Sequence, residues 1–136
     1  MKNNYDVSHA IRLLPGEYLK TSIQQYVNKH KIKAGWILTC VGSLTSYNIR
    51  FANLPEGTID NGYFEIVSLT GTVSKNGSHI HISIADSTGK TIGGHLLQGC
   101  TIYTTAEIII AESSGYIFTR KTDNKTSYAE LQIKEK

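Results

Sequence analysis

One stretch near the start of the chain carries apolar side chains at helical spacing. Within residues 18–31, Leu19, Ile23, Tyr26 and Val27 are separated by four, three and one positions, and mostly Lys, Gln and Asn lie between them. Such positions share one side of an α-helix. We therefore predict one amphipathic helix here, and no other segment shows a comparably clear helical pattern.

The rest of the chain shows the shorter period of β-strands. Runs of this kind fall at residues 9–13, 36–41, 47–51, 63–73, 78–86, 91–97, 101–111, 116–121 and 128–133. Gly42-Ser43 is expected to end one strand, and residues 54–62 are expected to form an exposed loop. About nine strands and one helix, without regular strand–helix alternation, predict an α+β fold: a single domain over residues 1–136 with a largely antiparallel β-sheet.

Composition narrows the class of protein. The chain has 136 residues, and its 14 Lys and Arg against 11 Asp and Glu leave a net charge of +3. That length suits one domain, and the composition excludes collagen-like, disordered and coiled-coil proteins. Without a long apolar run or a signal segment, the protein is expected to be soluble and cytoplasmic, with no membrane partner. The basic residues are scattered and match no helix-turn-helix or zinc-finger pattern.

Two cysteines, Cys40 and Cys100, lie in apolar, strand-like stretches. They lack the close spacing of a zinc knuckle or a redox pair. We expect both to be buried free thiols.

Three of the five histidines lie in one predicted hairpin, within residues 78–97. Side chains alternate along a strand, so His79 and His81 share the face opposite to that of Ile80. The place of His95 depends on the turn, because a shift of one residue moves the side chains of a strand to the other face. A two-residue turn would place His95 opposite Ile80, away from the other two histidines.

A three-residue turn, Ser87-Thr88-Gly89, is the competing register. This turn favours glycine at its third position, where the backbone is left-handed, and residue 89 is Gly89. In this register His81 stands opposite His95, and facing Cβ atoms are about 4.5–5.5 Å apart. The Gly93-Gly94 pair leaves room for close approach.

In that register His79, His81 and His95 can converge on one metal, at bond lengths of about 2.0–2.1 Å for zinc. Three neutral imidazoles without a carboxylate or thiolate leave one position open, as in catalytic zinc sites. We predict a metal site here, with zinc or another divalent transition metal. The alternative is that the three histidines are polar residues on the solvated face of a hairpin.

Several ordered segments resemble the plant and prokaryote conserved (PPC) domain family, in its stand-alone prokaryotic type. The matching segments are Arg12-Leu13-Leu14-Pro15-Gly16-Glu17, Gly62-Tyr63-Phe64-Glu65-Ile66-Val67-Ser68-Leu69-Thr70-Gly71, His79-Ile80-His81-Ile82-Ser83-Ile84-Ala85-Asp86, Gly93-Gly94-His95-Leu96-Leu97, Gly99-Cys100-Thr101-Ile102-Tyr103-Thr104-Thr105-Ala106-Glu107 and Phe118-Thr119-Arg120-Lys121-Thr122-Asp123. The resemblance covers nearly the whole chain. It implies a homotrimer, a mixed sheet with one helix and, as in bacterial members, a metal site at His79, His81 and His95.

The resemblance also bears on DNA. In plants the domain follows an AT-hook, an Arg-Gly-Arg-Pro segment that reads the minor groove, and there it mediates trimerisation and contacts with transcription factors. This chain has no such segment, and Tyr63 stands where the plant motif has arginine. The resemblance as a whole still implies a DNA-associated or regulatory binding module. Its partners would be nonspecific DNA or a regulatory protein.

The implied fold is also similar to that of acetolactate decarboxylase, a zinc enzyme with a histidine-x-histidine pair and a third histidine on a sheet. A metal-dependent enzyme acting on a small carbonyl or hydroxy-acid substrate is therefore the alternative function. It would need a cation and an acid/base carboxylate near the metal. Arg50 and Glu107 are the candidates, although Glu107 could equally orient a histidine or be a paired structural carboxylate. A binding module is favoured over an enzyme, and a third alternative is an interaction module with neither activity.

Overall fold

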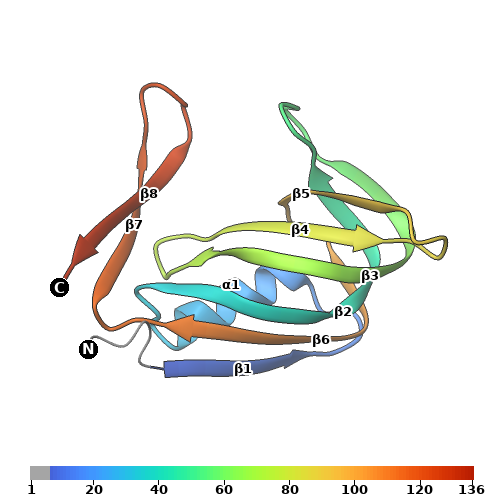
Figure 1. Cartoon of the computed structure of the whole chain (residues 1–136), viewed down its shortest axis with the longest axis horizontal. Coiled ribbons are helices and arrows are strands. Elements are labelled where there is room, and N and C mark those ends of the chain that lie inside the picture. Colours follow the sequence, from blue (N-terminus) through green and yellow to red (C-terminus); the bar gives the residue numbers. More distant parts are fainter. Residues whose placement is uncertain (1–6) are drawn as a thin grey trace.

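A six-stranded sheet, in the order β1-β6-β2-β3-β4-β5, runs through the computed structural model, which describes residues 7–136 (Figure 1). A separate pair, β7 and β8, forms a hairpin that stands out from one end of this sheet. The elements are β1 (Val7–Leu13), α1 (Leu19–Lys29), β2 (Gly35–Arg50), β3 (Thr58–Val73), β4 (His79–Ala85), β5 (Thr91–Leu96), β6 (Thr101–Glu112), β7 (Tyr116–Thr122) and β8 (Ala129–Glu135).

The predicted α+β fold, with one helix and a largely antiparallel sheet, is confirmed. Every strand pairing within residues 7–136 is antiparallel, so the described part of the chain lacks the mixed sheet that the family resemblance implies. The helix α1 has 11 residues, and no helix in this part of the chain is both long and apolar enough to cross a membrane.

Strand β2 continues through Gly42 and Ser43, where the sequence predicted its end, so residues 7–136 form eight strands in place of about nine. A Cβ atom on Gly42 would overlap the carbonyl oxygen of Thr105 and lie 2.7 Å from Cα of Ala106. The hydroxyl of Ser43 lies 2.9 Å from that of Thr104. Glycine at this point lets β6 approach β2 closely and does not form a turn.

The predicted loop at residues 54–62 is shorter than expected. Strand β3 begins at Thr58, because residues 58–61 pair with the far end of β2. A register shift between Leu44 and Ser46 separates this pairing from the rest of the β2–β3 ladder, as a β-bulge does. The far end of β2, beyond this shift, also pairs with β5.

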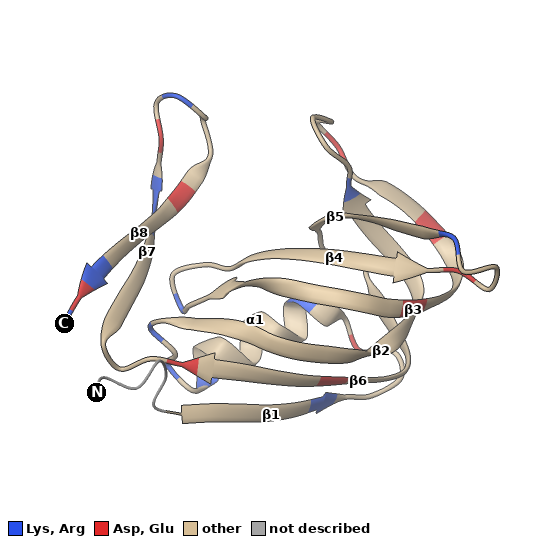
Figure 2. Cartoon of the chain, in the orientation of Figure 1, with Lys and Arg blue, Asp and Glu red and all other residues tan. Residues whose placement is uncertain are grey.

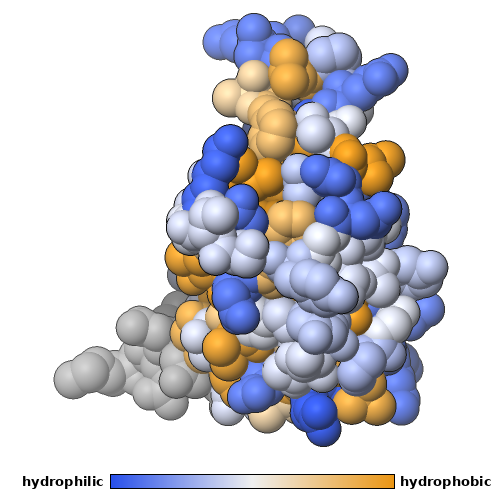
Figure 3. Space-filling model, turned by 90° about the vertical axis from the view of Figure 1, so that its right-hand side faces the viewer, coloured by the Kyte–Doolittle hydropathy of each residue, from blue (hydrophilic) through white to orange (hydrophobic). Residues whose placement is uncertain are grey.

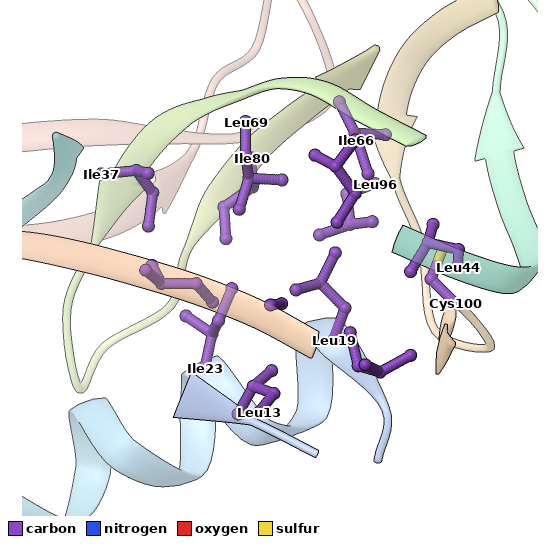
Figure 4. Packing of buried hydrophobic residues seen from close by; sticks show 14 of the residues in the cluster. Leu13, Leu19, Ile23, Ile37, Leu44, Ile66, Leu69, Ile80, Leu96 and Cys100 are labelled. Atoms are coloured by element: carbon purple, nitrogen blue, oxygen red, sulfur yellow. The ribbon is translucent and has the colours of Figure 1, made fainter. Parts of the chain in front are cut away.

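Helix α1 covers the inner face of the sheet. Its residues Leu19, Ile23 and Val27 are buried, and Figure 4 shows the first two pointing toward side chains of the strands, including Ile37 and Ile80. Burial of each such side chain contributes about 1.5–3 kcal/mol. The predicted amphipathic face of the helix is therefore the face that closes the core.

Two further contacts position the region around the histidines. Strand β5 pairs with the far end of β2, with Arg50 opposite His95, which closes β2, β3, β4 and β5 into a ring. The β7–β8 hairpin is anchored at its base by Phe118, whose N–H donates to the carbonyl of Lys33 at 2.9 Å. The side-chain amide of Asn76 donates to the carbonyl of Phe118, also at 2.9 Å. The hairpin thereby starts beside the turn that precedes β4.

Candidate metal centre

The turn between β4 and β5 has the three-residue form. The N–H of Asp86 donates to the carbonyl of Lys90 at 2.9 Å, and the N–H of Gly89 donates to the carbonyl of Asp86 at 2.9 Å. Gly89 has a φ of +82°, the left-handed conformation expected at this position. The resulting register places His81 opposite His95, which confirms the predicted pairing.

The three histidines converge on the outer face of the sheet. Nε2 of His79 and Nε2 of His81 are 3.2 Å apart. The ring centroid of His95 lies 5.2 Å from that of His79 and 5.8 Å from that of His81. One nitrogen from each ring lies within 4.8 Å of those of the other two, and within residues 7–136 no other histidine, cysteine or carboxylate group forms such a cluster.

The cluster fits a small divalent metal. Two imidazole ligands at zinc bond lengths on a tetrahedral ion are about 3.3 Å apart, which is close to the 3.2 Å between His79 and His81. Nδ1 of His95 is buried and has no hydrogen-bond partner in the described part of the chain. Buried polar nitrogens are rarely left without a partner. Three imidazoles without a carboxylate form a donor set that suits zinc and neighbouring transition metals.

The surroundings keep two of these imidazoles neutral, which is the form that binds metal. Burial, with the positive charge of Arg50 as the next cause, lowers the pKa of His95 to about 4. Burial also lowers the pKa of His79, with further contributions from His81 and Arg120. At neutral pH both rings therefore carry a free lone pair and no charge.

A cavity of about 550 Å³ adjoins the histidines. Its lining residues are Arg50, Asn76, Gly77, Ser78, His79, His95, Arg120, Tyr128, Ala129 and Glu130. The structure thus places Arg50, the cation proposed from the sequence, beside two of the predicted ligands. Arg120 and Glu130 come from the β7–β8 hairpin, and nothing in their local sequence pointed to the histidines.

Glu107, the carboxylate proposed from the sequence, does not line this cavity. It lies on β6 opposite Arg12 of β1 and Val41 of β2. The strands that carry the histidines are β4 and β5, which do not pair with β6. The prediction that Glu107 serves the histidine cluster is therefore not supported, and Glu130 is the carboxylate that the fold brings to the cavity.

The other two histidines have structural contacts. His9 lies 2.8 Å from the hydroxyl of Tyr26 and 2.7 Å from a carboxylate oxygen of Glu112. The ring of His30 stacks on that of Tyr26, with 4.1 Å between centroids. His9 therefore joins α1 to β1, and the ring of His30, whose centroid lies 5.6 Å from that of His9, packs beside the same contact.

Both cysteines are free thiols, as predicted. Cys100 is fully buried, whereas Cys40 is only partly buried, so the expectation of a buried thiol holds for one of them. Burial, followed by the negative charge of Glu107, raises the pKa of Cys40 to about 12. Burial also raises the pKa of Cys100. Neither thiol lies in the histidine cluster, so neither is a candidate ligand.

Comparison with known sequences agrees with the resemblance seen in the motifs. Residues 2–114 match the model of the Plants and Prokaryotes Conserved (PCC) domain. The "Bifunctional protein GlmU" of Synechococcus sp. is 41% identical over 127 residues, which are 93% of this chain and 20% of that protein. The "AT-hook motif nuclear-localized protein 13" of Arabidopsis thaliana is 35% identical over 98 residues, 63% of this chain and 22% of that protein. The chain thus spans about a fifth of the length of these relatives.

Solved structures share the fold over at least 95% of the chain. A hypothetical protein from Salmonella cholerae-suis has a TM-score of 0.94 and 35% identity, covering 100% of this chain and 99% of its own. The metal-containing protein AF0104 from Archaeoglobus fulgidus has a TM-score of 0.81 and 25% identity, with 95% of each chain covered. A plant- and prokaryote-conserved protein from Pyrococcus horikoshii has a TM-score of 0.78 and 25% identity, covering 96% and 95%.

Proposed function

This chain belongs to the Plants and Prokaryotes Conserved (PCC) domain family, and from that premise we propose that it is a DNA-associated regulatory module. In this proposal it acts in the cytoplasm as a homotrimer and holds zinc at His79, His81 and His95. The observation that carries the metal site is the convergence of three imidazole nitrogens within 4.8 Å of one another. The metal-containing relative from Archaeoglobus fulgidus, which shares the fold and 25% of the sequence, supports it further.

The names of related proteins support association with DNA more strongly than the distribution of basic residues on this chain does. The relative from Arabidopsis thaliana is named for an AT-hook motif and for nuclear localisation. On this chain, lysines and arginines are spread over several strands and turns (Figure 2), with a net charge of +3. Three chains at +3 each would carry +9 in a trimer. Such a charge favours phosphate contacts without base readout.

We expect DNA binding to be nonspecific and strongly dependent on salt. Because phosphate contacts release counterions, the apparent Kd should rise at least about tenfold between 50 and 200 mM salt. Fluorescence anisotropy with two duplexes of unrelated sequence measures this. Replacing Lys29, Lys31 and Lys33 together with glutamine should weaken binding more than replacing the isolated Lys90. Weak binding that does not change with salt would contradict the DNA proposal.

The homotrimer is supported by apolar side chains on the outer face of the sheet. Val41 on β2 is 58% exposed and Val67 on β3 is 57% exposed. The β2–β3 register on either side of them places these two residues opposite each other. Tyr63 and Tyr103 add an exposed aromatic pair, with ring centroids 4.9 Å apart. Exposed apolar surface of this kind is typical of contacts between chains.

In the described part of the chain, the end of the molecule that carries the β4–β5 turn has no continuous apolar surface of this kind. Figure 3 shows hydrophilic and hydrophobic side chains mixed across that end, with no single apolar patch covering it. Homotrimer contacts are therefore proposed at the outer face of β2 and β3, around Val41 and Val67.

We expect light scattering to give three times the chain mass of 15.0 kDa. Replacing Val67 with glutamate should reduce this to the mass of one chain, because burying an unpaired carboxylate in an interface is costly. Glutamate at Ile133, which is 62% exposed on β8 of the separate hairpin, is the matched control and should leave the trimer intact. A wild-type chain that stays monomeric at micromolar concentration would exclude the trimer.

One observation favours the alternative function, a metal-dependent enzyme acting on a small carbonyl or hydroxy-acid substrate. Arg50 lines the cavity together with His79 and His95, and Glu130 supplies a carboxylate in the same cavity. A zinc ion there would polarise a carbonyl oxygen. The fold similarity to acetolactate decarboxylase that first suggested this chemistry stays a prediction.

A further inference from the structure

The cavity beside the histidines is built from two distant parts of the chain. The ring of strands contributes Arg50, His79 and His95, and the β7–β8 hairpin contributes Arg120 and Glu130. Its volume of about 550 Å³ falls in the range of small-molecule sites, about 300–1,000 Å³. The cavity is therefore large enough for a ligand that extends well beyond one metal-bound water.

The wall of the cavity carries two guanidinium groups. Arg50 lies over the ring of Tyr128, with 5.5 Å from Cζ to the ring centroid. Nη2 of Arg120 donates to the hydroxyl of Thr72 at 2.9 Å. Within residues 7–136 neither arginine takes part in a salt bridge. Arg50 is thus positioned by an aromatic ring and Arg120 by a hydroxyl, and the carboxylate of Glu130 acts on Arg120 without forming a salt bridge.

The charge balance of the cavity is positive. The lining residues include two guanidinium groups, those of Arg50 and Arg120, and one carboxylate, that of Glu130. Arg120 is partly buried, and this burial lowers the pKa of its guanidinium, while the carboxylate of Glu130 acts in the opposite direction. A partly desolvated guanidinium gains more from an anion than a fully hydrated one. A metal on the histidines would add further positive charge.

We propose that this cavity binds a small oxyanion, a carboxylate or a phosphate group held by Arg50 and Arg120, next to the histidine cluster. The proposal rests on the metal site of the proposed function for its second contact. Guanidinium groups match the geometry of both oxyanions. Three imidazoles leave a position on the metal that an oxygen of the same ligand would fill. A regulatory module with such a site would sense a small anionic metabolite.

Isothermal titration of the full chain, purified without a histidine tag, tests the site. The probes are glycolate, acetate and inorganic phosphate, each titrated into zinc-loaded and metal-free protein. We expect glycolate to bind the zinc-loaded protein at least about tenfold more tightly than acetate, because its hydroxyl adds an oxygen donor. Phosphate binding that exceeds glycolate binding would identify a phosphate group as the natural oxyanion.

Arg50→Gln and Arg120→Gln should each weaken binding of the preferred probe by about 10- to 100-fold, the usual effect of losing a charge-assisted hydrogen bond. Lys121→Gln is the matched control, since Lys121 neighbours Arg120 in sequence but does not line the cavity. Arg120→Lys keeps the charge and should retain part of the affinity. Thermal unfolding checks that each variant is folded.

The outcomes separate the two proposals. Failure to bind zinc, with anion binding that still needs both arginines, would contradict the metal site and leave the oxyanion site standing. Zinc binding without any glycolate or phosphate binding at concentrations up to about 10 mM would overturn the oxyanion site alone. Anion binding that both glutamine variants retain would overturn it as well.

Discussion

His81→Ala will remove tight zinc binding and leave the domain folded. His81 supplies one of the three nitrogens in the cluster, and its Nε2 lies 3.2 Å from that of His79. Losing even an outer hydrogen-bond partner of a metal ligand costs about 10–100-fold in affinity, so the loss of a ligand should cost at least about 100-fold. The side chain is exposed, so the free energy of unfolding of the metal-free protein should change by only about 0.5 kcal/mol.

Zinc per chain, measured by mass spectrometry of untagged protein, and affinity, measured against a competing chelator, check this expectation. Ser83→Ala is the matched control, because Ser83 follows His81 on the same face of β4 and lies outside the cluster. An unchanged zinc content in His81→Ala would show that the metal is held elsewhere. Replacing all three histidines while retaining a folded trimer would show that the metal has no structural role.

Gly94→Ala will destabilise the fold and weaken the metal site together. A Cβ atom at this position would overlap the carbonyl oxygen of Arg50 and lie 3.1 Å from Cγ2 of Ile49. Strand β5 would have to move away from β2, and the adjacent His95 would move with it. Overpacking of this kind costs about 1–3 kcal/mol.

Chemical denaturation gives the free energy of unfolding, and the chelator competition gives zinc affinity for the same variant. Gly115→Ala is the control, because the nearest atom to its added Cβ would be Oγ of Ser113 at 3.5 Å, an ordinary contact. Its unfolding free energy should stay within about 0.5 kcal/mol of wild type. If Gly94→Ala matched the control in both measurements, the close approach of β5 to β2 would not be needed for the site.

The geometry of the histidine hairpin could be predicted from the sequence because it depends on residues that are close together along the chain. Side-chain alternation fixes the common face of His79 and His81. Glycine at position 89 selects the three-residue turn, which sets the register and brings His95 to the same face. Each of these rules involves residues a few positions apart, so one sequence contains all the information they need.

The sequence-based predictions failed where a distant strand decides the outcome. Gly42-Ser43 was expected to end a strand, yet Gly42 continues β2 because the backbone of β6 packs directly against it. A glycine in a strand pattern is equally consistent with a turn and with close approach of another backbone, and only the partner strand distinguishes them. Glu107 lies in a segment that resembles a family motif, but its strand, β6, pairs with β1 and β2 and not with the strands that carry the histidines.

By itself the sequence determined the fold class, the amphipathic helix and the three histidines of the candidate metal site, because periodicity and turn chemistry act over short distances. Tertiary structure alone decided what surrounds those histidines. Pairing of β2 with β5 sets Arg50 opposite His95, and the β7–β8 hairpin brings Arg120 and Glu130 to the same cavity from the other end of the chain. Such contacts depend on how whole elements pack: the sequence offered Arg50 only as a candidate cation, and no local pattern in Arg120 or Glu130 points to the histidines.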